Sequence, residues 1–186
     1  MILVVTTSSP NLGCAVFSPN GEMLRHAEVV APQQAAELLM SLVTQVVSAE
    51  ELKTVTGFVA DKGPGGFSGI RIGLTMIKTW GWMFGKPVAG ISAFDLFEAD
   101  SGVWIPVRKG EWVRNDSEGR VVTHEFSGVG YGTGIADPTF PSVRHLRLDF
   151  DALNWQDAAE LVPEYLAEPS ISTPKKAFAV WDGRSS

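Results

Sequence analysis

Two segments of the chain are apolar on nearly every side when they are drawn as helices. Residues 33–47 leave only a narrow polar stripe, and between Ile70 and Phe84 only Arg71 and Lys78 are charged. A helix that is apolar all round is buried all round, whereas a surface helix has one apolar face. The pattern therefore predicts two helices that need cover on more than one side, either from their own chain or from a second polypeptide.

Short apolar runs bounded by turn residues predict the strands around these helices. The runs are 2–5, 14–17, 23–29, 55–60 and 88–92, and a short helix is expected at 93–99. Ser18-Pro-Asn-Gly21 has the composition of a hairpin turn between the second and third strands. Hairpins that feed helix–strand units form a mixed sheet covered by helices, so we expect an α/β lobe over residues 1–100.

Beyond residue 101 the pattern changes to short strands and glycine-rich loops. The expected elements are strands at 103–107, 111–114 and 120–125, a flexible loop at 128–134, a strand at 144–148 and a helix at 155–162 capped by Asn154. We predict a reduced second lobe over residues 101–172 and a loose tail at 173–186.

A glycine-rich loop joins the fourth predicted strand to the second apolar helix. Its motif residues are Gly63, Pro64, Gly65, Gly66, Phe67, Ser68, Gly69 and Arg71. Glycine permits positive φ and close approach of the backbone, and Ser68 is placed to cap the helix. Helix N-terminal amides can also bind a phosphate. The loop lacks the Walker spacing, and Gly63-x-Gly65-x-x-Ser68 matches the dinucleotide-binding fingerprint G-x-G-x-x-G at only two of its three glycines. Two interpretations stay open, a tight strand-to-helix turn and an anion site.

Glycines also recur inside the second helix, where Gly69, Gly73 and Gly81 lie four and eight residues apart. Each interior glycine costs about 1 kcal/mol relative to alanine, so close approach of another helix is expected to offset it. The helix is either a core helix or part of a partner surface. The residues predicted at such a surface are Leu39, Val43, Val46, Ile70, Gly73, Leu74, Ile77, Trp80, Gly81 and Phe84.

Composition limits the classes of function. The 186 residues carry 15 basic and 21 acidic side chains, for a formal net charge of −6, and no basic run occurs. Tight direct binding to a nucleic-acid backbone needs clustered Lys and Arg, so it is not expected of this chain alone. The one cysteine, Cys14, excludes an internal disulfide and suits a reducing compartment. Neither a signal peptide nor an apolar run of about 18 residues is found, so we expect a cytoplasmic protein.

Residues that could carry chemistry are few. His26, His124 and His145 are isolated in the sequence, which predicts no metal site, and no catalytic residue is predicted. Ser68 sits at a helix start, where capping explains it better than a catalytic triad.

Charged and aromatic residues near the glycine-rich loop have structural explanations as well. We expect Asp61 beside Lys62 to be solvated, and Arg71 to pair with a carboxylate. Trp80 and Trp82 fit either core packing or an interface, where Trp is often a hot spot.

The block Gly63-Pro-Gly-Gly-Phe-Ser-Gly-Ile-Arg-Ile-Gly73, followed by Lys86-Pro-Val-Ala-Gly-Ile-Ser92, resembles the TsaB (YeaZ) family. Arg108-Lys-Gly-Glu111 and Pro163-Glu-Tyr-Leu-Ala-Glu-Pro169 resemble two further segments of that family. These proteins are dimerisation subunits of the bacterial tRNA threonylcarbamoyladenosine machinery. The resemblance implies an actin-like ATPase (ribonuclease H-like) fold, with a complete N-terminal lobe and a reduced C-terminal lobe.

The chain departs from the family where carboxylates would hold Mg²⁺. Thr6 stands where the first strand usually ends in aspartate, and Pro106 stands where the second lobe has one. Phosphoryl transfer needs metal positioning and charge neutralisation, which a hydroxyl and a proline do not supply. We therefore expect no cofactor, with ATP or ADP binding doubtful, and no ATP hydrolysis.

The resemblance implies a non-catalytic scaffold for modification of tRNA adenosine 37. It would bind a TsaD-like catalytic subunit through residues 33–47 and 68–84, in a bundle of four helices. A TsaE-like ATPase is a further expected partner, the chain alone would form a homodimer, tRNA would be met only through the complex, and no membrane is involved. The alternative is a small actin-fold ATPase or sugar-kinase-like nucleotide-binding protein.

Overall fold

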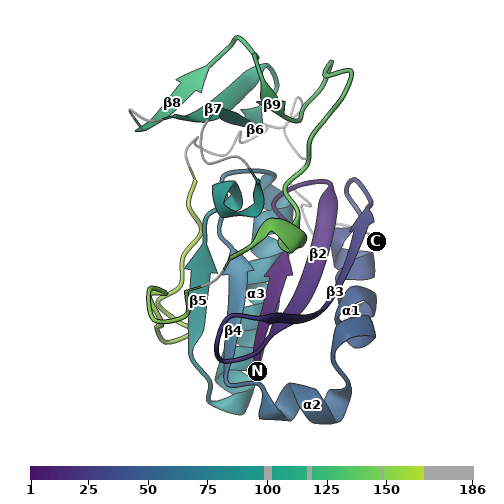
Figure 1. The fold of residues 1–186 in the computed structure, drawn as a ribbon, viewed down its shortest axis with the longest axis vertical. Coiled ribbons are helices and arrows are strands. Elements are labelled where there is room, and N and C mark those ends of the chain that lie inside the picture. The colour runs from purple at the N-terminus through teal and green to yellow at the C-terminus, as the bar shows by residue number, and fades with distance from the viewer. Residues whose placement is uncertain (99–101, 117–118, 148, 166–186) are drawn as a thin grey trace, which may run out of the picture.

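A mixed five-stranded sheet is the framework of the molecule (Figure 1). The structure is a computed structural model, and it describes residues 1–98, 102–116, 119–147 and 149–165. The sheet has the order β3-β2-β1-β4-β5. Strand β2 pairs antiparallel with both β1 and β3, whereas β4 pairs parallel with both β1 and β5. Its strands are β1 (Ile2–Thr6), β2 (Asn11–Phe17), β3 (Met23–Val30), β4 (Gly57–Asp61) and β5 (Val88–Ile91).

Three helices follow the hairpin strands. They are α1 (Ala35–Val46), α2 (Ala49–Thr54) and α3 (Phe67–Phe84). Both expected helices are present, whereas α2 was not predicted. The signal for α2 was Ser48 followed by Glu51, which form a capping box. Helix α3 ends at Gly85, which takes a left-handed conformation with φ of 60°.

The strands alternate between two buried faces. Leu3 and Val5 point toward α1 and α3, while Ile2 and Val4 point to the opposite side, as the two-residue period of a strand requires. Figure 1 shows the long helices on one side of the sheet only. The helix side contains the larger apolar cluster, which includes Leu39, Val43, Phe58, Leu74 and Ile77.

The opposite face of the sheet is covered by the C-terminal part of the chain. The short helical turn η2 (Val143–His145) and the side chains of Phe150, Leu153 and Trp155 pack on Ile2, Val4, Phe17 and Val59. Part of the segment predicted to form a second lobe therefore packs on the first sheet.

Two elements predicted in this segment are wrong. Residues 144–147 form no strand, and residues 155–162 form no helix. The first segment forms the turn η2 instead, because the amides of His145 and Leu146 donate to the nearby carbonyls of Ser142 and Val143. The second segment has backbone groups that bond to distant partners. Gln156 exchanges two backbone hydrogen bonds with Val88 of β5, and the Glu164 amide donates to the Lys62 carbonyl. The Trp155 ring also fills the space above Gly57, where an added Cβ would lie 2.6 Å from the ring.

A second, smaller sheet lies beyond η1 (Ala93–Leu96). It contains β6 (Val103–Arg108), β7 (Glu111–Asp116), β8 (Gly119–Thr123) and β9 (Val129–Gly130), in the order β8-β7-β6-β9. Its core joins Val103, Ile105 and Val113 to Phe94 and Phe97. The predicted flexible loop at 128–134 contains β9 and the buried Tyr131. The tail predicted at 173–186 lies outside the described residues.

Candidate functional site

The carboxyl ends of the parallel strands β1 and β4 form the sheet edge where α/β proteins usually bind ligands. Here that edge is closed by the chain's own carboxylate. Asp61 is 1% exposed, and its two oxygens accept hydrogen bonds from the backbone amides of Thr7 and Ser8, each at 2.9 Å. The expectation that Asp61 is solvated is wrong, because the strand ends directly beneath the β1–β2 turn.

The buried position of Asp61 affects its acidity and that of a neighbour. Burial raises the pKa of the Asp61 carboxyl, while the hydrogen bonds from Thr7 and Ser8 act in the opposite direction. The Tyr131 hydroxyl lies 3.5 Å from the Ser8 carbonyl oxygen. Burial and the charge of Asp61 both raise the pKa of Tyr131. Sequence analysis missed Tyr131, because it lies in a glycine-rich stretch that predicts a loop.

The glycine-rich loop packs directly on the same turn. The Gly66 amide donates to the Ser8 carbonyl at 2.6 Å, and a Cβ added to Gly65 would lie 2.3 Å from that oxygen. Helix α3 begins at Phe67 with Gly66 as its N-cap, and no side chain caps it. Ser68 is therefore not the cap: it is an exposed residue inside the first turn. The loop has the geometry of a tight strand-to-helix turn.

The interior glycines of α3 allow it to approach strands rather than another helix. A Cβ on Gly69 would lie 2.0 Å from the Thr7 carbonyl oxygen, and one on Gly73 would lie 2.3 Å from the Thr7 hydroxyl. A Cβ on Gly81 would lie 2.5 Å from a methyl group of Val88. The expected close approach of another helix is corrected to close approach of Thr7, the residue after β1, and of Val88 in β5.

Because of this packing, most residues predicted for a partner surface lie in the interior of the chain. All of them except Phe84, which is half-buried, are buried in the chain's own core. The buried ones are Leu39, Val43, Val46, Ile70, Gly73, Leu74, Ile77, Trp80 and Gly81. Periodicity identified the two apolar helices, but the face chosen for a partner is the face that the sheet covers.

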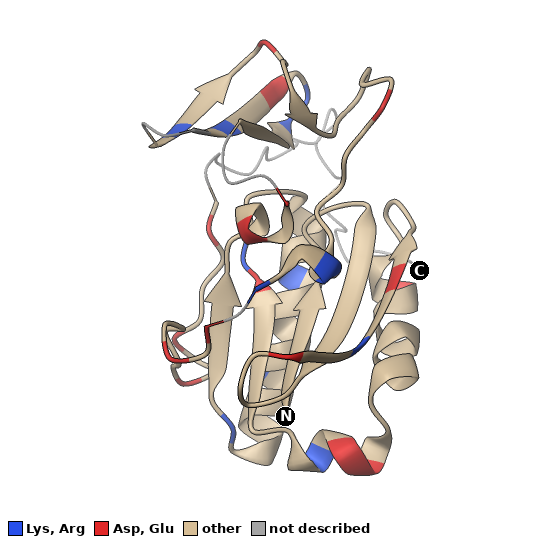
Figure 2. Cartoon of the chain, viewed as in Figure 1, with Lys and Arg blue, Asp and Glu red and all other residues tan. Residues whose placement is uncertain are grey.

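The outer faces of α1 and α3 carry a different set of apolar residues. Between the helices lies a groove with a volume of about 450 Å³, which we call the α1–α3 groove. Among the described residues, Arg71 is its one charged lining residue, and Figure 2 shows few charges on these two helices compared with α2. The lining residues are Ala36, Met40, Arg71, Ile72, Thr75, Met76, Thr79 and Trp80.

Exposed apolar side chains occur in the groove and near the C-terminal end of α3. Met40 is 46% exposed, Met83 54% and Trp82 83%. The two tryptophans thus differ: Trp80 packs in the core with its ring centroid 5.7 Å from that of Phe58, whereas Trp82 faces solvent. Large exposed apolar side chains that gather on one surface mark an interaction site.

Comparisons with known proteins agree with this geometry. A family model described as TsaD, tRNA N6-adenosine threonylcarbamoyltransferase, matches residues 28–99, which include α1 and α3. The tRNA threonylcarbamoyladenosine biosynthesis protein TsaB of Bacillus subtilis is 28% identical over 102 residues. That match covers 53% of this chain and 44% of the relative, so it spans less than half of the relative's length. In sequence, the chain is TsaB-like.

Solved structures extend the likeness to the fold. YeaZ from Pseudomonas aeruginosa superimposes with a TM-score of 0.64 at 18% identity, over 89% of this chain and 99% of that chain. A structure described as an uncharacterised protein with similarity to peptidase YeaZ from Pseudomonas aeruginosa gives the same TM-score at 17% identity. The predicted resemblance to the TsaB (YeaZ) family and the predicted actin-like (ribonuclease H-like) fold are confirmed.

Arg71 of this TsaB-like chain does not pair with a carboxylate among the described residues, contrary to expectation. Its guanidinium lies over the Phe67 ring, 5.3 Å from the ring centroid. The Phe67 ring in turn stacks on Tyr165 at a centroid distance of 4.7 Å. An aromatic platform therefore holds Arg71 at one end of the α1–α3 groove.

The residues considered for catalysis and metal binding lie apart in the TsaB-like chain. Thr6 is buried at the end of β1, and Pro106 is a half-buried residue of β6. His26 is on β3, His124 follows β8 and His145 ends η2. In the described ranges, no group of three or more His, Cys, Asp or Glu side chains could hold a metal ion. Nor does any helix there have the length and apolar character needed to cross a membrane.

Proposed function

We propose that this TsaB-like chain is a non-catalytic scaffold subunit in the biosynthesis of threonylcarbamoyladenosine in tRNA. The likeness to a Bacillus subtilis protein named for that pathway supports the pathway. The α1–α3 groove supports the scaffold role, and it is the observation that carries the proposal. An apolar groove whose lining includes the exposed Met40 is suited to receiving helices of another protein.

The proposed occupant is the matching helix pair of a TsaD-like catalytic subunit. A family model for TsaD matches residues 28–99 of this chain, so a TsaD-like protein has a segment of related sequence. Two related helix pairs can pack groove to groove around an approximate two-fold axis, as in an isologous interface. The same geometry allows two copies of this chain to form a homodimer when the partner is absent.

The closed sheet edge supports the absence of ATP hydrolysis. The two amides that would face an anion at the end of β1 donate to Asp61 instead. These amides are therefore not free for a phosphate, and Thr6 offers no carboxylate for Mg²⁺. The alternative, a small actin-fold ATPase, requires ATP turnover with Mg²⁺. Turnover that disappears in an Asp61→Ala variant would favour the alternative.

Binding to a TsaD-like protein tests the main proposal. Size-exclusion chromatography with light scattering should give a one-to-one complex with the purified partner. Met40→Asp should reduce the affinity at least tenfold, since it places a charge in an apolar interface. The matched control is Leu24→Asp on β3, because Leu24 has the same exposed fraction of 46% and does not line the groove.

Three outcomes would contradict the scaffold role. They are no complex with a TsaD-like protein, equal loss of binding in both variants, and a complex that Met40→Asp leaves intact. The same measurement on the chain alone tests the homodimer, which Met40→Asp should dissociate.

The proposal also includes further partners of the complex and its location in the cell. We include a TsaE-like ATPase as a further partner, contact with tRNA through the complex, and a cytoplasmic location. The net charge of −6 supports contact with tRNA through partners rather than directly.

A further inference from the structure

A second cavity lies where η1, β7 and η2 meet, and it shares no lining residue with the α1–α3 groove. Its volume is about 410 Å³. Small-molecule sites usually have about 300–1,000 Å³ and often lie between domains. The walls come from the segment 94–98, from Asn115 of the small sheet, and from the end of η2 with Arg147. The cavity therefore lies between the small sheet and the two short helical turns η1 and η2.

The chemical groups of the walls differ from one segment to another. The segment after β5 supplies the carboxyl groups of Asp95 and Glu98. The end of η2 supplies the imidazole of His145, and the residues after η2 supply the guanidinium of Arg147. Carboxylates bind an ammonium group, and a guanidinium binds a carboxylate with two parallel hydrogen bonds. We propose that this cavity binds a small zwitterion with an ammonium and a carboxylate group, which is the chemistry of a free α-amino acid.

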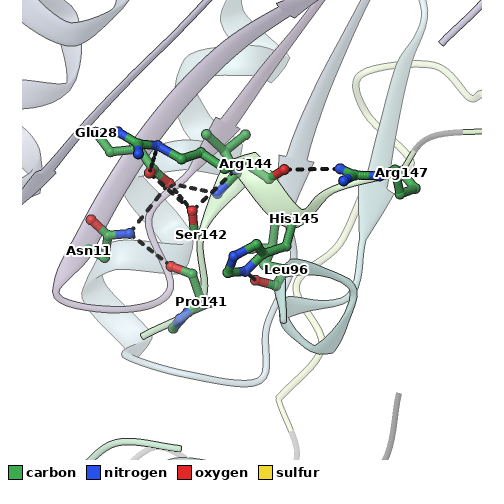
Figure 3. A network of polar contacts seen from close by, with 9 residues as sticks. Asn11, Glu28, Leu96, Pro141, Ser142, Arg144, His145 and Arg147 are labelled. Carbon is green, nitrogen blue, oxygen red and sulfur yellow. Dashed lines mark hydrogen bonds and ion pairs between the residues drawn. The ribbon is translucent and has the colours of Figure 1, made fainter. Parts of the chain in front are cut away.

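The segment that carries His145 and Arg147 is held in place by a network around Glu28 (Figure 3). The Glu28 side chain, 10% exposed, accepts hydrogen bonds from the Ser142 hydroxyl at 2.9 Å and from the Val143 amide at 2.7 Å. It also pairs with Arg144, whose Nε lies 3.1 Å from a Glu28 oxygen. Glu28 therefore fixes η2 on the edge of β3 before any ligand arrives.

A contact between η1 and η2 joins the two charged walls. The His145 ring nitrogen Nδ1 lies 3.3 Å from the Leu96 carbonyl oxygen. This contact sets the distance between the Asp95–Glu98 wall and the Arg147 wall. A preorganised site loses less conformational entropy on binding, which favours a small ligand.

Donors and acceptors in this cavity are only partly used. Nη1 of Arg147 donates to the carbonyl oxygens of Arg144 and Leu146, at 3.0 and 3.2 Å. Within the described residues, its Nη2 and Nε make no hydrogen bond, so one edge of the guanidinium fork is available. Asp95 uses Oδ2 to accept from the Ser92 amide at 2.9 Å, and its Oδ1 accepts no hydrogen bond in the described part of the chain.

Matched probes of one size test the proposal. The full chain, labelled with ¹⁵N, is titrated with L-alanine, with L-alanine methyl ester, which lacks the carboxylate, and with N-acetyl-L-alanine, which lacks the ammonium. We expect L-alanine to shift the backbone amide signals of Phe97, Asn115 and His145. We also expect about tenfold tighter binding than for either analogue, because each analogue loses one charged hydrogen-bonding group.

A substitution in one wall sharpens the test. Arg147→Gln should abolish the preference for L-alanine over its methyl ester, since the ester lacks only the group that Arg147 binds. Arg147 is exposed, so the variant should fold, and its unfolding midpoint checks this. The control is Arg25→Gln on β3, an exposed arginine that does not line the cavity.

Several results would overturn the proposal. Equal affinity for L-alanine and its ester would indicate a site for simple cations, and binding of the acetylated analogue alone would indicate a site for simple anions. No shifts in the cavity, or a preference unchanged by Arg147→Gln, would also refute it. None of these results bears on the α1–α3 groove, so the proposed scaffold role stands or falls separately.

Discussion

The two sides of helix α3 are built from similar residues and have opposite roles. Leu74 and Ile77 on the inner side are buried against the sheet, and the glycines beside them bring the helix backbone close to Thr7 and Val88. Met83 and Trp82 on the outer side are exposed. Both sides of the helix carry apolar side chains, but the sheet covers only the inner side.

This difference separates residues that hold the fold from residues that are free for a partner. A substitution on the inner side should change the free energy of unfolding, while one on the outer side should change association only. A substitution that unfolds the chain also abolishes partner binding, so it is uninformative about an interface. Gly73 is such a position, because any side chain there meets Thr7.

The largest expected effect is on a buried leucine. Leu74→Ala should lower the free energy of unfolding by about 2–5 kcal/mol, because it removes buried methyl groups and leaves a cavity. Met83→Ala, on the exposed side, should change it by less than about 0.5 kcal/mol. Urea unfolding followed by circular dichroism measures both. Equal losses would mean that the outer side is also structural.

The next effect concerns the close approach of α3 to β1. Gly69→Ala should cost about 1–3 kcal/mol, even though alanine favours a helix, because the added Cβ meets the Thr7 carbonyl. Gly66→Ala is the matched control, since its Cβ would lie 3.4 Å from the Ser8 carbonyl oxygen. A stabilised Gly69→Ala protein would show that the backbone contact is looser than described.

A third prediction uses the buried carboxyl at the sheet edge. Because the pKa of Asp61 is raised in the folded state, the folded chain binds the proton more tightly than the unfolded chain. The stability from this group is complete below pH 3.8 and is lost as the pH rises through the folded pKa. The free energy of unfolding should therefore fall with pH in the wild type relative to Asp61→Asn, in urea titrations over that range.

Glu51 titrates with the opposite sign and must be controlled in the same experiment. The hydrogen bond from Arg25 lowers the pKa of Glu51 from 4.5 to about 2, so its contribution is lost as the pH falls through that interval. A Glu51→Gln background removes this contribution. Suppose that, in this background, the free energy of unfolding with Asp61 rises with pH relative to that of the Asp61→Asn variant. The hydrogen bonds from Thr7 and Ser8 then lower the pKa of Asp61 by more than burial raises it.

The smallest effect on folding is expected at the most exposed aromatic residue. Trp82→Gln should leave the free energy of unfolding within about 0.5 kcal/mol of the wild type, since the side chain is 83% exposed. It should weaken self-association or binding of a TsaD-like protein if the apolar surface beside the groove is an interface. A Trp82→Gln chain that unfolds more easily would place Trp82 in the fold instead.

Local patterns predicted the first half of the chain well. Short apolar runs bounded by turn residues identified all five strands of the first sheet, and the two apolar stretches are the helices α1 and α3. Such elements depend on period and turn residues, which a single sequence contains. The missed α2 is short, and its only signal is a capping box.

Errors arose where distant residues decide the structure. The helix predicted at 155–162 fails because Gln156 pairs with Val88, and the solvated Asp61 fails because Thr7 and Ser8 fold over it. Most residues predicted for a partner surface pack in the chain's own core, because periodicity does not reveal which side of a helix the sheet covers; Trp80 also lines the α1–α3 groove. Tyr131 was invisible because its partner Ser8 lies 123 residues away.

The coverage of the first sheet by residues 143–155 has a consequence for synthesis of the chain. Until that segment leaves the ribosome, Ile2, Val4, Phe17 and Val59 have no cover on one side, although all five strands of the sheet have already emerged. The nascent chain therefore carries an apolar surface until those residues are made, and such surfaces favour aggregation or chaperone binding. Closure of this face of the core therefore waits for the residues around Val143 and Trp155, rather than for completion of the N-terminal half.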